Sequence, residues 1–471
     1  MSPEGHRRTP RFAAVRVALG ACGLLLFGAA CAGPAPSPAD PPTSASTALP
    51  PPSPTPLPTL TPVRTPAAGG LYVDAAQPQG PISPLVFGTN YGPLLFVPLQ
   101  MQPSAQEAHL TVLRYPGGNW GDNNDIDLWN LDQFVAFARQ IGAEPYICVR
   151  LKGGTAAKAA ELVRYANVEK GYQVHFWSIG NEPNLYEDYS VEQFNADWRQ
   201  WATAMRAVDP SITLLGPEIN RFFASPTNNY EIKLARWMTE FLRVNGDLVD
   251  VVSFHRYPFP LVFNGSPPTI DQLRADSRKW EQLILDLRSL VRAHAGRDLP
   301  IAITEANSSW VPVSNGEATL DSHYNAIWWG DSLGRMIRQG AFMVNQFGIS
   351  SEWGLMGNYE VRPIYYVYKM YQRFGTQGLY ASSDDPAVSV FAATTAEGVP
   401  TLMIVNLAST PVTKTLTIAG GPGRVRAETW LLDQDHNAEQ IEATELDATT
   451  QLTLSPESMT LLVLCDCGPR P

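Results

Sequence analysis

Two glutamates stand where a buried strand is expected to end. Residues 177–183 read Trp-Ser-Ile-Gly-Asn-Glu-Pro, so Glu182 follows an apolar run directly. Residues 301–307 read Ile-Ala-Ile-Thr-Glu-Ala-Asn, which puts Glu305 in the same position. A single glutamate of this kind is often a loop cap or half of an ion pair. Two of them together indicate a pair of reacting carboxyl groups.

Paired carboxyl groups are what cleavage of a glycosidic bond requires. One group protonates the leaving oxygen while the other attacks the anomeric carbon. A separation of about 5–5.5 Å permits a covalent glycosyl intermediate and retention of configuration. The two groups must then differ in protonation near neutral pH, one being neutral and the other ionised.

The elements that would position these glutamates form a repeating pattern. Short β-rich apolar runs alternate with amphipathic helical stretches such as residues 191–208. Eight such units predict a TIM barrel over residues 84–378, with its active site at the carboxyl ends of the strands. The expected strands cover residues 85–90, 112–117, 145–151, 175–181, 213–217, 251–257, 301–304 and 342–347. Glu182 and Glu305 would follow the fourth and seventh strands.

The pattern changes near residue 379. Alternating strands without helices predict an antiparallel β-sandwich over residues 379–471, and the segment 71–83 is expected to add a strand to it. The expected fold class is therefore α/β, a (β/α)8 TIM barrel followed by a C-terminal antiparallel β-sandwich.

The first 70 residues resemble an export and tethering segment. Residues 1–30 combine an arginine-containing start with an apolar run that is short for a membrane span, which predicts a signal peptide. Small residues precede Cys31, as in a bacterial lipoprotein signal, so we expect either lipid attachment at Cys31 or plain secretion. Residues 31–70 are rich in proline, serine and threonine and predict an extended spacer. Membrane contact is expected only through the lipid.

Composition excludes several classes of protein. The 471 residues are 44% hydrophobic and 17% charged, which is too polar for a multi-span membrane protein. A net charge of −11 argues against a nucleic-acid partner. The five cysteines do not form a disulfide framework, because only Cys148 lies inside the globular part. No metal-binding or nucleotide-binding motif stands in a supporting context, so neither a metal nor a cofactor is expected.

Further segments around the glutamates resemble glycoside hydrolase clan A, whose members are retaining enzymes on a TIM barrel. The motifs are most similar to families 51, 44, 39 and 79. The Asn-Glu that ends the fourth strand resembles the clan's acid/base motif, so the resemblance implies that Glu182 is the acid/base and Asn181 binds a sugar hydroxyl. The same resemblance makes Glu305 the nucleophile.

Other residues of this resemblance surround the expected pocket. Residues 113–119, Leu-Arg-Tyr-Pro-Gly-Gly-Asn, resemble the second-strand motif, in which Arg114 would steady the nucleophile and Asn119 would contact the sugar. Residues 254–257 resemble the clan's His-x-Tyr, with His255 at the substrate site and Tyr257 bonded to the nucleophile. Trp353 is the candidate platform beneath the sugar.

Two features depart from the pattern or lie outside it. The third strand offers Arg150 and Lys152 where family 51 tends to have an asparagine. Glu218 is a third acid at a strand end, on the fifth strand, and its expected role is either substrate binding or structural.

These observations favour a retaining glycoside hydrolase that acts on a polysaccharide or oligosaccharide carbohydrate substrate. The runner-up within this class is an α-L-arabinofuranosidase of the family 51 kind, because the second-strand motif is so similar. A hypothesis from another class is a non-catalytic glycan-binding lipoprotein. A pure binder would have no need of both glutamates with Asn181, Arg114 and Tyr257.

Overall fold

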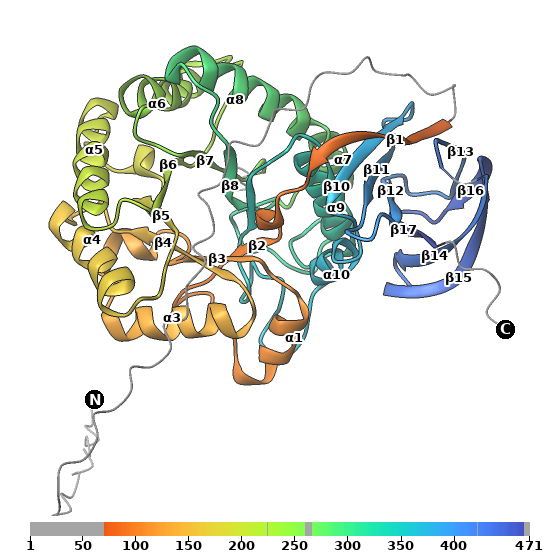
Figure 1. The fold of residues 1–471 in the computed structure, drawn as a ribbon, viewed down its shortest axis with the longest axis horizontal. Coiled ribbons are helices and arrows are strands. Elements are labelled where there is room, and N and C mark those ends of the chain that lie inside the picture. Colours follow the sequence, from red (N-terminus) through yellow and green to blue (C-terminus); the bar gives the residue numbers. More distant parts are fainter. Residues whose placement is uncertain (1–69, 224, 260–265, 422, 466–471) are drawn as a thin grey trace, which may run out of the picture. The chain divides into compact units, whose positions relative to one another are not determined.

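A closed barrel of eight parallel strands forms the first part of the fold (Figure 1). The structure is a computed structural model that describes residues 70–223, 225–259, 266–421 and 423–465. The barrel strands are β2 (Gly88–Asn90), β3 (Val112–Tyr115), β4 (Glu144–Val149), β5 (Phe176–Ile179), β6 (Thr213–Ile219), β7 (Val251–Arg256), β8 (Ile301–Ala306) and β9 (Met343–Gln346). The expected TIM barrel is confirmed.

Helices connect these strands and cover the outside of the barrel (Figure 1). Most of the longer helices bury one stripe of side chains. In α5, for example, Phe194, Trp198 and Met205 recur at helical spacing on the buried side, and Ser190 caps the first turn. The helices are α1 (Gln102–Glu107), α2 (Trp120–Asn123), α3 (Leu128–Gln140), α4 (Ala156–Val163), α5 (Val191–Val208), α6 (Asn229–Asn245), α7 (Ile270–Ser277), α8 (Lys279–Ala295), α9 (His323–Arg338) and α10 (Pro363–Tyr371).

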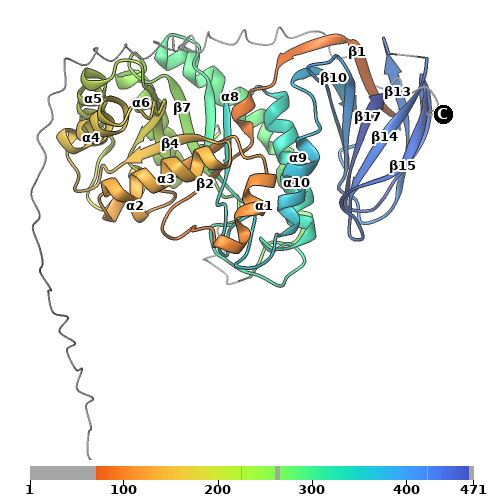
Figure 2. The same ribbon diagram turned by 60° about the horizontal axis from the view of Figure 1, so that its bottom comes forward.

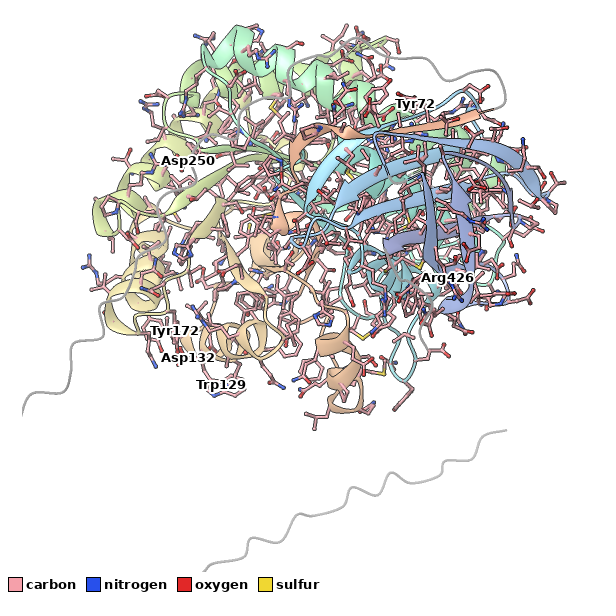
Figure 3. All side chains as sticks on the ribbon, turned by 45° about the vertical axis from the view of Figure 1, so that its right-hand side comes forward. Tyr72, Trp129, Asp132, Tyr172, Asp250 and Arg426 are labelled. Atoms are coloured by element: carbon pink, nitrogen blue, oxygen red, sulfur yellow. The ribbon has the colours of Figure 1, made fainter. Side chains whose placement is uncertain are left out.

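Strand burial explains why the barrel forms. All four residues of β5 and all six of β8 are buried, as expected for parallel strands that are covered on both faces. Polar contacts on the outside tie neighbouring elements together. Asp132 on α3 accepts hydrogen bonds from the hydroxyls of Tyr165 and Tyr172, and Asp132 and Tyr172 are labelled in Figure 3.

A nine-stranded sheet follows the barrel, and we call it the sheet domain. It consists of β1 (Gly70–Pro81), β10 (Gln377–Ser383), β11 (Val388–Thr394), β12 (Pro400–Asn406), β13 (Val412–Ala419), β14 (Arg424–Leu432), β15 (Asn437–Asp447), β16 (Thr449–Leu454) and β17 (Ser458–Cys465). The sheet is antiparallel except where β1 pairs with β13. All nine strands bond into one continuous sheet, and residues from both of its ends share one core. The expected fold class is confirmed.

Helix α9 is packed against the sheet domain as well as the barrel. Figure 2 shows α9 and α10 between the barrel strands and the strands of the sheet domain. Every residue of α9 from Tyr324 to Ile337 is buried. Gly330 and Gly334 allow close approach, because a methyl group at either position would overlap with Met459 or Phe391 of the sheet domain. Apolar residues of both parts therefore form a single core.

The expected signal peptide, Cys31 and the proline-rich spacer lie outside the described residues. Within the described part of the chain, no helix is both long enough and apolar enough to cross a membrane.

Gly334→Ala tests the contact between α9 and the sheet domain. Alanine ordinarily stabilises a helix by about 1 kcal/mol relative to glycine. Here the added methyl group would overlap with the Phe391 ring. We expect the free energy of unfolding to fall by about 1–3 kcal/mol, as for other overpacked cores.

Chemical denaturation measures this change. Gly423→Ala is the control, since no atom lies within 4 Å of its added methyl group. A stabilised Gly334→Ala protein would contradict the packing described here.

Candidate active site

The carboxyl ends of β5 and β8 bring Glu182 and Glu305 together. Glu305 lies within β8, and Glu182 follows β5 by three residues. One oxygen of each carboxyl group lies within 4.8 Å of the other. Inverting glycosidases hold their carboxyl groups about 6.5–9.5 Å apart, to leave room for a water molecule. The arrangement therefore suits a mechanism in which one carboxylate attacks the sugar directly.

Glu305 is surrounded by hydrogen-bond donors. Its Oε1 accepts from Arg114 at 2.6 Å and from the backbone N–H of Gly118 at 2.9 Å, and its Oε2 accepts from the hydroxyl of Tyr257 at 2.9 Å. Burial and the neighbouring carboxylates raise the pKa of Tyr257 well above its ordinary value, so its hydroxyl stays protonated and donates. In all three contacts the Glu305 carboxyl group is the acceptor. The expected contacts of Arg114 and Tyr257 with Glu305 are present.

Arg114 is a buried cation that joins several strand ends. Its side chain is 0% exposed. One amino group donates to Glu305, and the other contacts Glu218 at 2.7 Å and the side-chain oxygen of Asn181 at 3.0 Å. The guanidinium therefore fixes residues from β5, β6 and β8 relative to one another. Asn181 is buried and is held from a second side, because its N–H donates to Asp122.

Glu182 has a different environment. Its side chain is 21% exposed, and its Oε1 lies 3.0 Å from Nδ1 of His255. Its backbone has a φ of 46°, in the left-handed region that costs a non-glycine residue about 1–3 kcal/mol. Strained residues of this kind cluster at functional sites. Glu182 is the more exposed of the two carboxyl groups and the one without an arginine partner in the described structure.

His255 lies between three carboxyl groups. Its Nδ1 faces Glu182 and also lies 3.5 Å from Oε2 of Glu305, while its Nε2 lies 3.3 Å from Oε2 of Glu218. Burial lowers the pKa of His255, but the nearby carboxylates outweigh this effect and raise it to about 10. The imidazole is therefore doubly protonated at neutral pH.

Glu218 is fully buried at the end of β6. Its Oε1 accepts from the hydroxyls of Tyr146 at 3.0 Å and Thr304 at 2.8 Å. Burial alone would raise the pKa of Glu218, but Arg114 and His255 lower it to about 2. Of the two roles considered from the sequence, complete burial favours the structural one, since this carboxylate is closed off from a substrate.

The remaining expected residues lie around this centre. The side chain of Asn119 is exposed at the start of α2. Trp353 packs against Phe347 with ring centroids 5.9 Å apart, and Phe347 packs against Tyr257 at 6.1 Å. Phe347 thus contacts both Trp353 and Tyr257, the residue whose hydroxyl donates to Glu305.

Two residues of the site were not singled out from the sequence. Phe347 is the first residue after β9, and a strand-end aromatic was the available signal. Asp122 lies on α2 and accepts from Asn181 and from the hydroxyl of Tyr186. Burial raises the pKa of Asp122 to about 6, against the opposing effect of these donors. Nothing in its local sequence distinguishes it from the other polar residues of that loop.

Glu182, His255 and Glu305 also have the spacing of three metal ligands. Their hydrogen bonds argue against that role. Both ring nitrogens of His255 face carboxylate oxygens and act as donors, and both oxygens of Glu305 already accept hydrogen bonds. This donor set suits proton transfer rather than cation binding.

Sequence comparison links part of the chain to known glycosidases. No family model matches it. Over 151 residues the chain is 28% identical to alpha-L-arabinofuranosidase C of Emericella nidulans, a match that covers 23% of this chain and 30% of that protein. The chain thus matches about three tenths of the length of this relative.

Structural comparison covers much more of the chain. The fold is similar to an alpha-L-arabinofuranosidase from Thermotoga maritima, solved as an arabinose complex, with a TM-score of 0.69 at 17% identity over 84% of this chain and 99% of that one. It is also similar to a Paenibacillus polymyxa xyloglucanase from glycoside hydrolase family 44, with a TM-score of 0.66 at 16% identity and the same coverage. The resemblance to clan A is confirmed.

The buried pair of Glu218 and Arg114 should make the free energy of unfolding depend on pH in the acidic range. The pKa of Glu218 is about 2 in the folded protein against an ordinary value of 4.5. A depressed folded-state pKa adds stability above the unfolded value, and this contribution is lost as the pH falls through the folded value. We expect Glu218→Gln to remove part of the loss of stability between about pH 4.5 and pH 2.

Chemical denaturation at a series of pH values measures this slope. Glu161→Gln, at an exposed position on α4, is the matched control and should keep the wild-type slope. Equal slopes for the wild type and Glu218→Gln would contradict an ionised Glu218.

Proposed function

We propose that this protein is a retaining glycoside hydrolase that cleaves a polysaccharide or oligosaccharide through a covalent glycosyl-enzyme. The observation that carries the proposal is a pair of carboxyl groups, with oxygens within 4.8 Å, in contrasting surroundings. Glu305 accepts hydrogen bonds from Arg114, Tyr257 and Gly118, whereas Glu182 is more exposed and contacts a histidine. This contrast supports Glu305 as the nucleophile and Glu182 as the acid/base.

The proposed reaction has two steps. An oxygen of Glu305 attacks the anomeric carbon, the glycosidic bond breaks, and the leaving oxygen takes the proton of Glu182. The Glu182 carboxylate then takes a proton from water, whose oxygen attacks the same carbon and releases Glu305. Two inversions give net retention. Asn181, Asn119 and Trp353, together with Phe347, are the proposed sugar contacts.

The sugar itself has two candidates. The sequence match to an arabinofuranosidase and the motif around Arg114 favour an α-L-arabinofuranoside. The fold is also similar to a xyloglucanase, with a TM-score of 0.66, which supports a β-linked glucan as the other candidate. Hydrolysis rates on an aryl α-L-arabinofuranoside and on xyloglucan separate the two candidates. A glycan-binding protein without catalysis would bind one of these and hydrolyse neither.

Replacing each glutamate should cause a different kinetic failure. In Glu305→Ala no glycosyl-enzyme can form, so kcat should fall on the order of 10⁴-fold or more on every substrate. In Glu182→Ala the loss should be about 10²–10⁴-fold on a natural glycoside, because the leaving group is not protonated. An activated aryl glycoside should largely escape that loss in the first step.

Azide distinguishes the two variants further. It needs no deprotonation, so it should restore turnover of an aryl glycoside by Glu182→Ala and give a glycosyl azide of retained configuration. Glu161→Ala is the control and should behave like the wild type. Equal losses on all substrates, without rescue in either variant, would refute the assigned roles.

We also propose that the protein is exported and tethered through a lipid on Cys31. The apolar run before Cys31 and the proline-rich spacer after it support this proposal. Cys31→Ala should move the protein from the membrane fraction to the soluble exported fraction. Unchanged membrane retention of Cys31→Ala, measured by fractionation, would rule out this attachment.

A further inference from the structure

Glu218, at the carboxyl end of β6, is linked to Glu182 in two ways: directly through the backbone, and through the side chain of His255. Glu218 touches neither Glu182 nor Glu305 through its carboxylate in the described contacts. Its carboxylate faces Nε2 of His255, and its backbone carbonyl accepts the N–H of Glu182 at 2.9 Å. His255 in turn faces Glu182 with Nδ1. Both the side chain of Glu218, by way of His255, and its backbone carbonyl therefore influence the position of Glu182.

The backbone of Glu218 is held in an unusual conformation. Its φ is 57°, in the left-handed region, as is the φ of 46° at Glu182. Such conformations persist only where the surrounding structure fixes them. Here the hydrogen bond from Glu182 N–H to Glu218 C=O joins the two strained residues directly.

The Glu218 carboxylate has more partners than a structural ion pair with Arg114 would need. The hydroxyls of Tyr146 and Thr304 donate to Oε1, while the side-chain nitrogens of Arg114 and His255 contact Oε2. An ionised carboxylate only accepts hydrogen bonds. Because this carboxylate is ionised, the Nε2 of His255 must carry a hydrogen.

We propose that Glu218 is a positioning residue that orients His255, keeps its imidazole doubly protonated, and so places a charged N–H donor between Glu182 and Glu305. This inference rests on the proposed function of those two glutamates. Nδ1 lies 3.0 Å from Oε1 of Glu182 and 3.5 Å from Oε2 of Glu305.

The donor is useful because negative charge moves during the reaction. Before glycosylation the charge is on Glu305 and Glu182 is neutral. Afterwards Glu305 is esterified and Glu182 is the carboxylate. A charged N–H between the two oxygens can stabilise the anion in both states with little movement, which is a form of electrostatic preorganisation. Glu218 fixes the opposite side of the ring, so the donor does not turn away.

The charged groups that face His255 come from several elements. Glu218 lies on β6, Glu305 on β8 and Glu182 after β5, while Arg114 on β3 opposes their effect. Replacing Glu218 by glutamine removes the negative charge that faces Nε2 of His255 and keeps the shape of the side chain. An adjacent opposite charge typically changes a pKa by about 1–3 units. We therefore expect His255 to lose its second proton about 1–3 pH units lower in Glu218→Gln.

Two measurements test this proposal. In the first, nitrogen-15 NMR follows the imidazole of His255 with pH, assigned by a His255→Asn variant. The wild-type ring should stay doubly protonated through pH 8, and the ring in Glu218→Gln should titrate lower. In the second, the alkaline limb of the pH profile of kcat/KM should move to lower pH in Glu218→Gln, while Glu218→Asp, which keeps the charge, should restore part of the shift.

A matched pair at the other end of the barrel provides the control. His175 also pairs with a glutamate, Glu144, at 3.9 Å. Glu144→Gln should change the titration of His175 and leave that of His255 and the pH profile unchanged. If the loss of any negative charge had a general effect, the titration of both histidines would shift in both variants. That outcome would overturn the proposal.

The remaining outcomes are also decisive. A folded Glu218→Gln protein with wild-type His255 titration and a wild-type pH profile would overturn the proposal. If Glu218→Gln does not fold, the wild-type spectrum still decides, because a neutral His255 ring at pH 7 would refute it. If the wild type lacks glycosidase activity, the proposed function fails, whereas the NMR result still reports on Glu218 and His255 alone.

Discussion

The contact of Arg114 with two buried carboxylates is the interaction on which the active-site structure depends. Ion pairs of this kind are costly to bury, and hydrogen bonds to the buried carboxylates offset part of that cost. Here Glu305 and Glu218 share one guanidinium, and Tyr257, Tyr146 and Thr304 supply the remaining donors. The cation therefore fixes both Glu305 and Glu218.

A barrel is well suited to this arrangement because its parallel strands end at the same face. Arg114, His255 and Glu305 come from three strands that are distant in sequence, and their side chains meet without an intervening loop. Rigid strands hold the polar centre, while loops such as the one that carries Asp122 contact it from outside. Differences in substrate between related barrels can then arise in the loops without disturbing the centre.

Much of the barrel and the position of its two central glutamates could be predicted from the sequence. The barrel strands were found because each is a short apolar run, and Glu182 and Glu305 because each follows such a run. Strands such as β15 escaped prediction, since six of its eleven residues are exposed, four are acidic, and the strand provides little apolar alternation. The contact of His255 with Glu182 could not be predicted either, because it depends on side-chain directions at the ends of β5 and β7, which are separated by β6. Phe347 was missed for the same reason, and it packs against Trp353, which is more conspicuous in the sequence.

The glycines of α9 have a consequence for inheritance. Because Gly330 and Gly334 let side chains of the sheet domain touch the helix backbone, the helix surface is shaped to one particular partner. A recombination event that exchanged the sheet domain for an unrelated module would leave this surface facing water or badly filled. The barrel and the sheet domain are therefore expected to be inherited together.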